Sequence, residues 1–335
     1  MSDPTPAWVG EHQTRIGFAL ELATVDTPSD PSGHIIRSGV LAEQLGFDAV
    51  FLPDHPSWLP ECWIHLSALA MRTERLRLGT GVACVLYRHP VLLARLAADL
   101  DHLSGGRVIL GIGAGWDQPE FARFGGAMPA SAARQAALDE AVTILRGVWG
   151  AEPFSFAGRH FRTSGAHVLP APVQQPHLPL LIAGGGERVT LGQVARWADA
   201  CQLSDAPILS GGRTAADVRR KLEVLRGHCE RAGRTFASIL RTHFTGWLVL
   251  ADSDAALRKR SAQYFPQGVE RRFAGEWAGF AVVLTADQAV AYFAERAAAG
   301  IQYFVVQILD AADHETIHLL AEHVMPRVRG GASGA

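Results

Sequence analysis

The sequence predicts a closed (β/α)8 barrel. About eight short apolar runs occur along the 335 residues, and nearly all of them are followed by a segment with helical spacing of apolar residues. The runs do not alternate with polar residues, which is typical of strands that are buried on both faces of a parallel sheet. The length is sufficient for one barrel with insertions. An open, doubly wound sheet is the alternative, because periodicity alone does not separate the two architectures.

The stretch 76–116 shows the repeating unit of this fold. The apolar runs Leu76–Val82 and Arg107–Ile112 flank one amphipathic helix. Pro90 suits the first turn of that helix, where a missing N–H costs nothing. Gly105 suits its end, because glycine accepts the left-handed conformation of a C-cap. The stretch is therefore a strand–helix–strand unit of parallel sheet.

The other elements follow the same rhythm. Residues 150–179 break it with five prolines and are expected to be an insertion that carries a hairpin over the barrel. We expect a single domain over 1–330, with a loose polar arm over 1–14 and a flexible Gly/Ala/Ser tail over 331–335. The remaining strands are predicted at 16–20, 48–52, 180–183, 201–203, 239–250 and 301–309, and helices at 34–45, 61–72, 131–149, 187–197, 214–232, 254–264 and 285–300.

Composition excludes several classes of protein. Apolar residues make up 48% of the chain and charged residues 19%, which indicates a large core. The net charge of −2, without a basic run, argues against nucleic acid as a partner. No apolar run approaches the roughly 18 residues of a membrane helix. The four cysteines form no C-x-x-C pair and no metal-binding motif occurs, so we expect no metal and a reducing cytoplasm.

In a barrel of this type, function lies in the loops that follow the strands. His55 comes directly after one predicted strand and has a side chain that exchanges protons near neutral pH. The alternative is a solvated loop histidine. Arg88 lies at the same end of the barrel, where it either meets an anion or is solvated. Trp63 opens the next helix and is either a pocket wall or part of the core.

Glycines mark three other strand ends. Gly184-Gly185-Gly186 precedes a predicted helix, and its bare backbone N–H groups favour phosphate binding, with Arg188 available for a further bond. A plain flexible turn is the alternative. Gly111-x-Gly113-x-Gly115 does not fit the dinucleotide fingerprint, because the third glycine is one position early. Close approach of a planar ligand to the backbone is the better interpretation, and Gly81-Val82 allows the same approach.

Several segments, in one fixed order over residues 16–205, make the chain resemble the luciferase-like monooxygenase superfamily, in its bacterial flavin- or deazaflavin-dependent branch. Any one segment is weakly diagnostic, whereas the ordered combination is specific. The last third matches more loosely, through 300–307. The matching segments are FDAVFLPDH (47–55), ECW followed by LSALA (61–63 and 66–70), RLRLGTGV (75–82), YRHP (87–90), LDHLSGGRVILGIGAGW (100–116), FAGRHF (156–161), the end of 172–186 (LLIAGGG) and ARWADA (195–200).

The resemblance implies a (β/α)8 barrel with a flavin-type ring near the ends of its strands and His55 as a proton carrier. It implies a non-proline cis peptide at Gly81-Val82 behind the ring, and a phosphate-binding turn from Ala183 to Gly186. It also implies a substrate pocket that includes Trp58, Trp63 and Trp116. The cofactor contacts expected on this basis are Asp54, Gly81, Val82, Ala114, Gly115, Ala183, Gly184, Gly185, Gly186, Leu203 and Ser204.

This chain departs from some relatives at two positions. Trp116 stands where some deazaflavin enzymes carry a glutamate, and Trp58 lies three residues after His55, where they have a tryptophan four residues after the histidine. A sugar-phosphate substrate is therefore disfavoured, and an apolar one is expected. Residues 265–280, with Phe265, Arg271, Arg272, Trp277 and Phe280, are either a lid over the substrate or an ordinary surface loop.

Two chemistries follow from the resemblance. With 8-hydroxy-5-deazaflavin (coenzyme F-420), hydride passes between the ring and a substrate carbon while His55 moves the proton. With FMN, a separate flavin reductase supplies reduced flavin, and oxygen is then used to oxygenate a small organic substrate. The resemblance further implies a homodimer. A flavin-storing barrel and a flavin-free, phosphate-binding lyase or isomerase are the alternatives.

Overall fold

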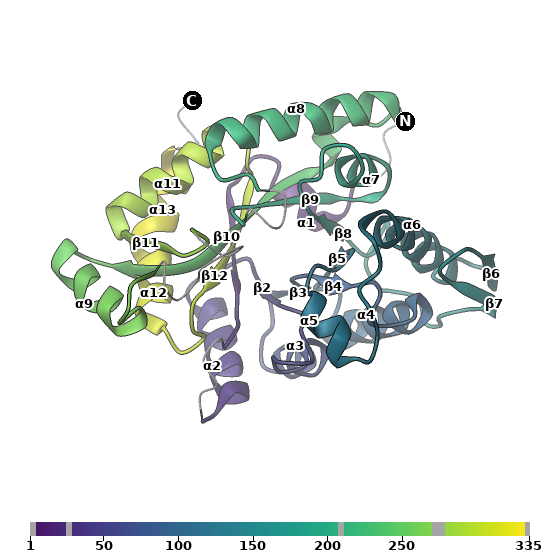
Figure 1. Ribbon diagram of the computed structural model, residues 1–335, viewed down its shortest axis with the longest axis horizontal. Coiled ribbons are helices and arrows are strands. Elements are labelled where there is room, and N and C mark those ends of the chain that lie inside the picture. The colour runs from purple at the N-terminus through teal and green to yellow at the C-terminus, as the bar shows by residue number, and fades with distance from the viewer. Residues whose placement is uncertain (1–4, 25–28, 207–210, 270–278, 332–335) are drawn as a thin grey trace.

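The computed structural model describes residues 5–24, 29–206, 211–269 and 279–331. Eight parallel strands form a closed barrel, because β1 pairs with β2 on one side and with β12 on the other, and β9 pairs with β10. The predicted (β/α)8 barrel is therefore confirmed, and the open sheet is excluded (Figure 1). The barrel strands are β1 (Gly17–Glu21), β2 (Ala49–Leu52), β3 (Arg77–Thr80), β5 (Val108–Gly113), β8 (Leu180–Ala183), β9 (Ala200–Ser204), β10 (Leu240–Ala251) and β12 (Tyr303–Ile308).

Helices cover the outside of the barrel after each strand (Figure 1). Two short strands extend the sheet: β4 (Ala83–Cys84) pairs with β5, and β11 (Val282–Thr285) pairs with β10. The helices are α2 (Pro31–Gln44), α3 (Cys62–Ala70), α4 (Pro90–Ser104), α5 (Gln118–Arg123), α6 (Ser131–Val148), α7 (Thr190–Trp197), α8 (Ala215–Arg231), α9 (Asp254–Tyr264), α11 (Ala286–Ala298), α12 (His314–Leu319) and α13 (Met325–Gly331), with a 3-10 turn at Phe236–Ser238 and a π-helical segment at Leu320–Val324.

Local sequence explains where several helices begin and end. α4 has Pro90 at its first position and ends at Gly105, which has a φ of 66°, as its glycine predicted. α11 begins with a reciprocal capping box between Thr285 and Gln288. These contacts satisfy backbone groups that a helix leaves unpaired at its ends.

The two faces of each strand bury different sets of side chains. Alternate residues face the barrel interior or the surrounding helices, as the pleat of a strand requires. The interior cluster contains Ala19, Phe51, Ile109, Leu181, Ala200 and Val305, whereas the outer layer contains Phe18, Val50, Leu110, Ile182, Cys201, Leu203 and Phe304. This alternation decides which residue at each strand end faces the barrel mouth.

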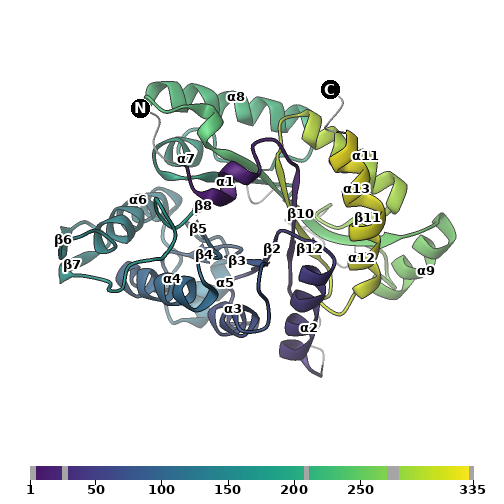
Figure 2. The same ribbon diagram turned by 180° about the vertical axis from the view of Figure 1, so that it is seen from behind.

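Residues 5–14 are not the loose arm that the polarity of 1–14 predicted; 1–4 lie outside the described residues. Helix α1 (Ala7–Glu11) lies under the barrel, and its Trp8 and Val9 are fully buried (Figure 2). The Trp8 ring meets Tyr303 edge-on at a centroid distance of 5.4 Å. The prediction failed because one buried tryptophan anchors an otherwise polar segment.

One carboxylate joins both ends of the chain at this lower end of the barrel. Asp48 accepts hydrogen bonds from Arg15 at 2.5 Å and from Arg329 of α13 at 2.9 Å. It also accepts from the backbone N–H of Phe18 at 2.8 Å. Burial opposes its ionisation, but His12, the backbone N–H of Phe18 and the charge of Arg15 lower the pKa of Asp48 to about 2.

The insertion contains a hairpin of β6 (Phe154–Ala157) and β7 (Arg162–Ala166). We expected this hairpin over the barrel. It lies instead beside α4 and α6, at the edge of the molecule (Figure 1). The Glu140 carboxylate of α6 fixes it there by accepting three backbone N–H groups, from residues 159–161. At the other end, α13 runs to Gly331, so the expected tail is helical at that residue; 332–335 lie outside the described residues.

Among the helices that the structure describes, none has the length and apolar character needed to cross a lipid bilayer. Cys62, Cys84, Cys201 and Cys229 are all free and buried.

Candidate active site at the mouth of the barrel

His55 and Glu120 form a hydrogen-bonded pair above the C-terminal ends of the strands. His55 lies in the loop after β2, and Glu120 lies in α5, after β5. The Nδ1 atom of His55 is 2.7 Å from a Glu120 carboxylate oxygen. Glu120 is fully buried and also accepts the Tyr87 hydroxyl at 2.8 Å and the backbone N–H of Ser57 at 3.0 Å.

These donors set the protonation state of the pair. Burial raises the cost of ionising Glu120, but hydrogen bonds from His55, Ser57 and Tyr87 outweigh it and lower its pKa to about 2. An ionised carboxylate only accepts hydrogen bonds, so Nδ1 of His55 carries a proton. Within the described residues Nε2 has no protein partner. The histidine therefore offers Nε2 for proton exchange.

Two indoles enclose the imidazole. The ring of Trp58 stacks on His55 at a centroid distance of 4.8 Å and an angle of 27°. Trp116 meets it edge-on at 5.2 Å and 72°. The Trp58 N–H donates to Asp117, whose side chain also caps the first turn of α5. The resemblance implied that Trp58 and Trp116 belong to a substrate pocket, and in the structure both indole rings contact the ring of His55.

Trp63 and Leu203 point away from this site. Trp63 is 5% exposed and belongs to the outer core, because α3 turns its apolar face toward the barrel. Leu203 belongs to the same core, since its neighbours Gln202 and Ser204 occupy the interior-facing positions of β9. Neither side chain lines the mouth, so both expectations are corrected. Gln202 faces the interior instead, and its Oε1 atom has no partner in the described residues.

The Asp54 carboxylate connects β4, Arg88 and α3. One oxygen accepts the backbone N–H of Cys84 at 3.1 Å and a guanidinium N–H of Arg88 at 2.7 Å, and the other lies 3.6 Å from the Cys62 sulfur. Arg88 also donates to Glu61 at 2.6 Å. Arg88 is therefore neither free for an anion nor solvated, and Asp54 anchors β4 directly beyond Gly81-Val82.

The small residues on this side allow close approach between strands. The Gly81-Val82 peptide is cis, as the resemblance implied. A Cβ on Gly81 would lie 2.1 Å from Oε2 of Glu21. Gly115 has a φ of 80°, and a Cβ there would lie 2.7 Å from the Cys84 sulfur. These glycines are required by neighbouring protein atoms, in addition to any contact with a planar ligand.

Glu21 is a second buried carboxyl at the barrel mouth. It is 1% exposed, and desolvation by burial raises its pKa well above the usual value. Gln307 donates to its Oε1 atom at 3.1 Å, while Oε2 has no partner among the described residues. Together with Gln202, Glu21 leaves unsatisfied polar atoms at the end of the barrel where a ligand would bind.

The glycine turn follows β8 as predicted. Gly184 has a φ of 122°, and its N–H donates to the Gln202 carbonyl at 3.0 Å. In the described part of the chain, the N–H groups of Gly185 and Gly186 have no acceptor. The helix begins at Thr190 rather than at 187, so a short turn separates it from the glycines. Arg188 lies exposed on that turn.

The lid hypothesis falls partly outside the described residues. Arg271, Arg272 and Trp277 are not among them. Phe265 and Phe280 are both buried, at 3% and 1% exposure. Phe280 packs in the barrel interior cluster, so it anchors the segment.

Sequence reasoning missed Glu120 and Glu21. A signal for Glu120 was present, because Asp117-x-x-Glu120 has the spacing of a helix start. In the structure, however, the Glu120 side chain reaches His55 instead of turning back to the cap. The hydrogen bond from Tyr87 to Glu120 and the inward orientation of Gln202 could be assigned only once the path of α5 and the strand phase were known.

Oxygen and nitrogen atoms of His55, Asp117 and Glu120 lie within 4.8 Å of one another, a grouping that could hold a metal ion. Protein donors already occupy both carboxylates, as described above. The arrangement is accounted for by hydrogen bonds around the imidazole.

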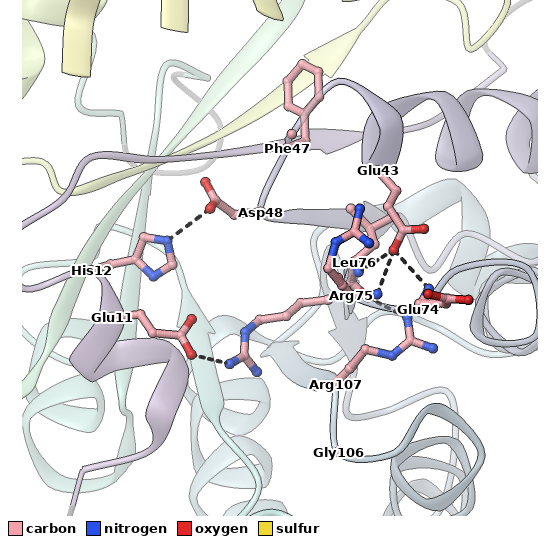
Figure 3. A pocket seen from close by; sticks show the side chains of 12 residues that line it. Glu11, His12, Glu43, Phe47, Asp48, Glu74, Arg75, Leu76, Gly106 and Arg107 are labelled. Carbon is pink, nitrogen blue, oxygen red and sulfur yellow. Dashed lines mark hydrogen bonds and ion pairs between the residues drawn. The ribbon is translucent and has the colours of Figure 1, made fainter. Parts of the chain in front are cut away.

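A separate pocket of about 400 Å³ lies at the opposite end of the barrel (Figure 3). Charged side chains that line this pocket already have partners within the protein. Glu11 forms an ion pair with Arg77 at 2.9 Å, and Glu43 accepts three backbone N–H groups from residues 74–76. Residues at this end of a (β/α)8 barrel serve stability rather than catalysis.

Comparison with known proteins agrees with this architecture. A family model described as luciferase-like monooxygenase matches residues 15–319. The F420-dependent glucose-6-phosphate dehydrogenase of Intrasporangium calvum is 37% identical over 172 residues, which cover 48% of this chain and 50% of that protein. The protein of the same name from Gordonia bronchialis is 31% identical over 239 residues, covering 68% of this chain and 67% of that protein. The chain thus spans about half the length of the first of these curated relatives.

A solved structure extends the similarity to nearly the whole chain. The monooxygenase RslO1 from Streptomyces bottropensis superposes with a TM-score of 0.77 and 26% sequence identity. The match covers 93% of this chain and 99% of that chain.

Proposed function

Because this chain belongs to the luciferase-like monooxygenase family, we propose that it is an oxidoreductase that binds FMN or the 8-hydroxy-5-deazaflavin coenzyme at the mouth of its barrel. The observation that carries this proposal is the pair of the partly buried His55 with the buried Glu120, with two indoles packed against the imidazole. The names of the relatives, an F420-dependent dehydrogenase and a monooxygenase, support the same class of reaction.

The residues at the mouth fit such a cofactor. The unpaired N–H groups of Gly185 and Gly186 suit a phosphate, and the unpaired Oε1 of Gln202 suits a ligand N–H. Ala114 and Gly115 directly follow β5 at the mouth, and Val82 packs against the barrel interior cluster. These groups come from four different strand ends, which is how a barrel of this type builds its site.

When bound, either cofactor supplies redox chemistry that amino-acid side chains lack. His55 exchanges the accompanying proton with the substrate through Nε2. Glu120 holds the imidazole in the required tautomer and stabilises its protonated form. The indoles of Trp58 and Trp116 form apolar walls beside the imidazole. We therefore favour a small apolar substrate over a sugar phosphate.

Titration of the purified protein with each cofactor tests this proposal. We expect binding of one of them well below millimolar concentration, followed by turnover with an organic substrate. Reaction of the reduced complex with air distinguishes FMN from the deazaflavin, which reacts poorly with oxygen. Failure to bind either cofactor would refute the proposal.

Replacing His55 separates catalysis from storage. We expect His55→Ala to lose turnover while its cofactor affinity is retained, because the residue handles a proton rather than the phosphate. His102→Ala is the matched control, since His102 is exposed on α4 and bonds only to the Ala171 carbonyl. A parent protein that binds cofactor but turns over no substrate would point to storage instead.

We further propose a cytoplasmic homodimer, which the four free cysteines and the exposed apolar residues on neighbouring helices support. A flavin reductase is needed as a partner only if the cofactor is FMN. Light scattering on the purified protein tests the dimer; a monomer would contradict it. The exposed apolar residues are Ile64 on α3, Met71 directly after that helix, and Leu92 and Leu103 on α4.

A further inference from the structure

A buried lysine lies behind the glycine turn. Lys221 projects from α8, is 5% exposed, and donates from Nζ to the carbonyl of Gly185 at 2.7 Å. A Glu187 oxygen lies 3.5 Å from the same nitrogen. That carboxylate is shared, because Arg220 forms an ion pair with it from the next position on α8. Lys221 therefore lacks a carboxylate of its own.

The lysine acts on the peptide that presents the turn. In a trans peptide the carbonyl of Gly185 and the N–H of Gly186 point in opposite directions. A cation on the carbonyl increases the polarisation of that peptide, so the N–H of Gly186 becomes a stronger donor on the far side. This N–H and that of Gly185 have no acceptor in the part of the chain that the structure describes.

Other groups around Lys221 leave its charge under-compensated. Desolvation by burial and the neighbouring Arg220 lower its pKa, while Asp217 acts in the opposite direction. An anion on the turn would supply the missing negative charge. The turn itself is tight at Gly186, because a Cβ there would lie 2.8 Å from the Thr190 hydroxyl.

We infer that Lys221 makes this turn selective for a phosphate-bearing ligand, by placing a buried positive charge behind the Gly185–Gly186 peptide. The inference rests on the proposed function for the identity of the ligand. It assigns to Lys221 a role in specificity without contact to the phosphate itself.

The test compares a ligand with and without its phosphate. FMN and riboflavin, or the deazaflavin coenzyme and its dephosphorylated riboside, are titrated against the parent protein and Lys221→Met, with flavin fluorescence as the readout. Methionine keeps the length of the buried stem and removes the charge. We expect the ratio of affinities, phosphorylated over dephosphorylated, to fall about tenfold or more, because the charge acts in a buried, weakly screened site. Affinity for the dephosphorylated ligand should be unchanged.

Two further variants sharpen the comparison. Glu187→Gln removes the opposing charge and should increase the same ratio. Arg219→Met removes an exposed charge from the same helix and should leave it nearly unchanged. A ratio that is unaltered in Lys221→Met, or a loss that is equal for both ligands, would overturn the inference.

Inorganic phosphate separates this inference from the proposed function. If the parent protein binds none of the four ligands, the proposed function fails. The turn is then assayed by the rise in melting temperature with phosphate, which a ligand that binds only the folded state produces. A rise in the parent that is lost in Lys221→Met supports the inference, and equal rises in both contradict it.

Discussion

Replacing Glu120 by glutamine removes one negative charge from the site and leaves its volume nearly unchanged. The pKa of this carboxyl is about 2, against 4.5 for an unperturbed glutamate. That difference corresponds to about 3 kcal/mol of folding free energy at pH 7. We therefore expect Glu120→Gln to lower the free energy of unfolding by about 3 kcal/mol. It should also slow turnover, because the imidazolium of His55 loses its counter-charge.

The pH dependence identifies the origin of this loss. The folded-state pKa of Glu120 lies below its unfolded value, so the stabilisation is complete above pH 4.5 and declines as the pH falls toward 2. The difference between parent and variant should shrink from about 3 kcal/mol at pH 7 to about 2 kcal/mol at pH 3.5. Urea unfolding followed by tryptophan fluorescence at the two pH values measures it.

Tyr87→Phe is the matched control for this variant. It removes one hydroxyl donor from Glu120 but leaves the carboxylate ionised and the His55 contact in place. We expect a loss of about 1–2 kcal/mol. A Glu120→Gln protein that is destabilised by less than about 1 kcal/mol at pH 7, or by the same amount at both pH values, would refute the assigned charge state.

Three further substitutions have defined outcomes in the same unfolding assay. Gly81→Ala should cost about 1–3 kcal/mol, because its Cβ would lie 2.1 Å from Oε2 of Glu21; unchanged stability would mean that Glu21 moves freely. Gly227→Ala should instead stabilise by up to about 1 kcal/mol, since its Cβ meets nothing closer than 3.5 Å inside a helix; a loss would show hidden crowding. Asp48→Asn should cost about 2 kcal/mol at pH 7, and the cost should fade as the pH drops from 3.8 toward 2, the unperturbed and folded pKa values of Asp48; a constant cost would contradict an ionic origin.

The barrel was predictable because its signals are local. Each apolar run and its following helix lie within about 30 residues of each other, and caps such as Gly105 mark where the helices end. His55 and the glycine turn could be placed because they directly follow strands. Their location depends on chain order alone, once the barrel is assumed.

The partners of these residues were not predictable in the same way. Glu120 reaches His55 across 65 positions, and Lys221 reaches Gly185 across 36. Such contacts depend on the path of α5 and the rotation of α8. Leu203 was misassigned for a related reason. The resemblance indicated the end of β9 but not the phase of the strand, and both faces of β9 are buried, so the sequence does not reveal which face is inward.

Asp48 forms ion pairs with both Arg15 and Arg329, and this has a consequence for how the chain folds during synthesis. Arg15 lies near the beginning of the described chain and Arg329 near its end, and both donate to Asp48. The β1–β12 pairing that closes the barrel likewise requires residues 303–308. A growing chain therefore exposes this edge of β1 until residues 303–308 have left the ribosome. Unpaired strand edges invite aggregation. Expression yield should accordingly depend on chaperone supply more than the stability of the finished barrel suggests.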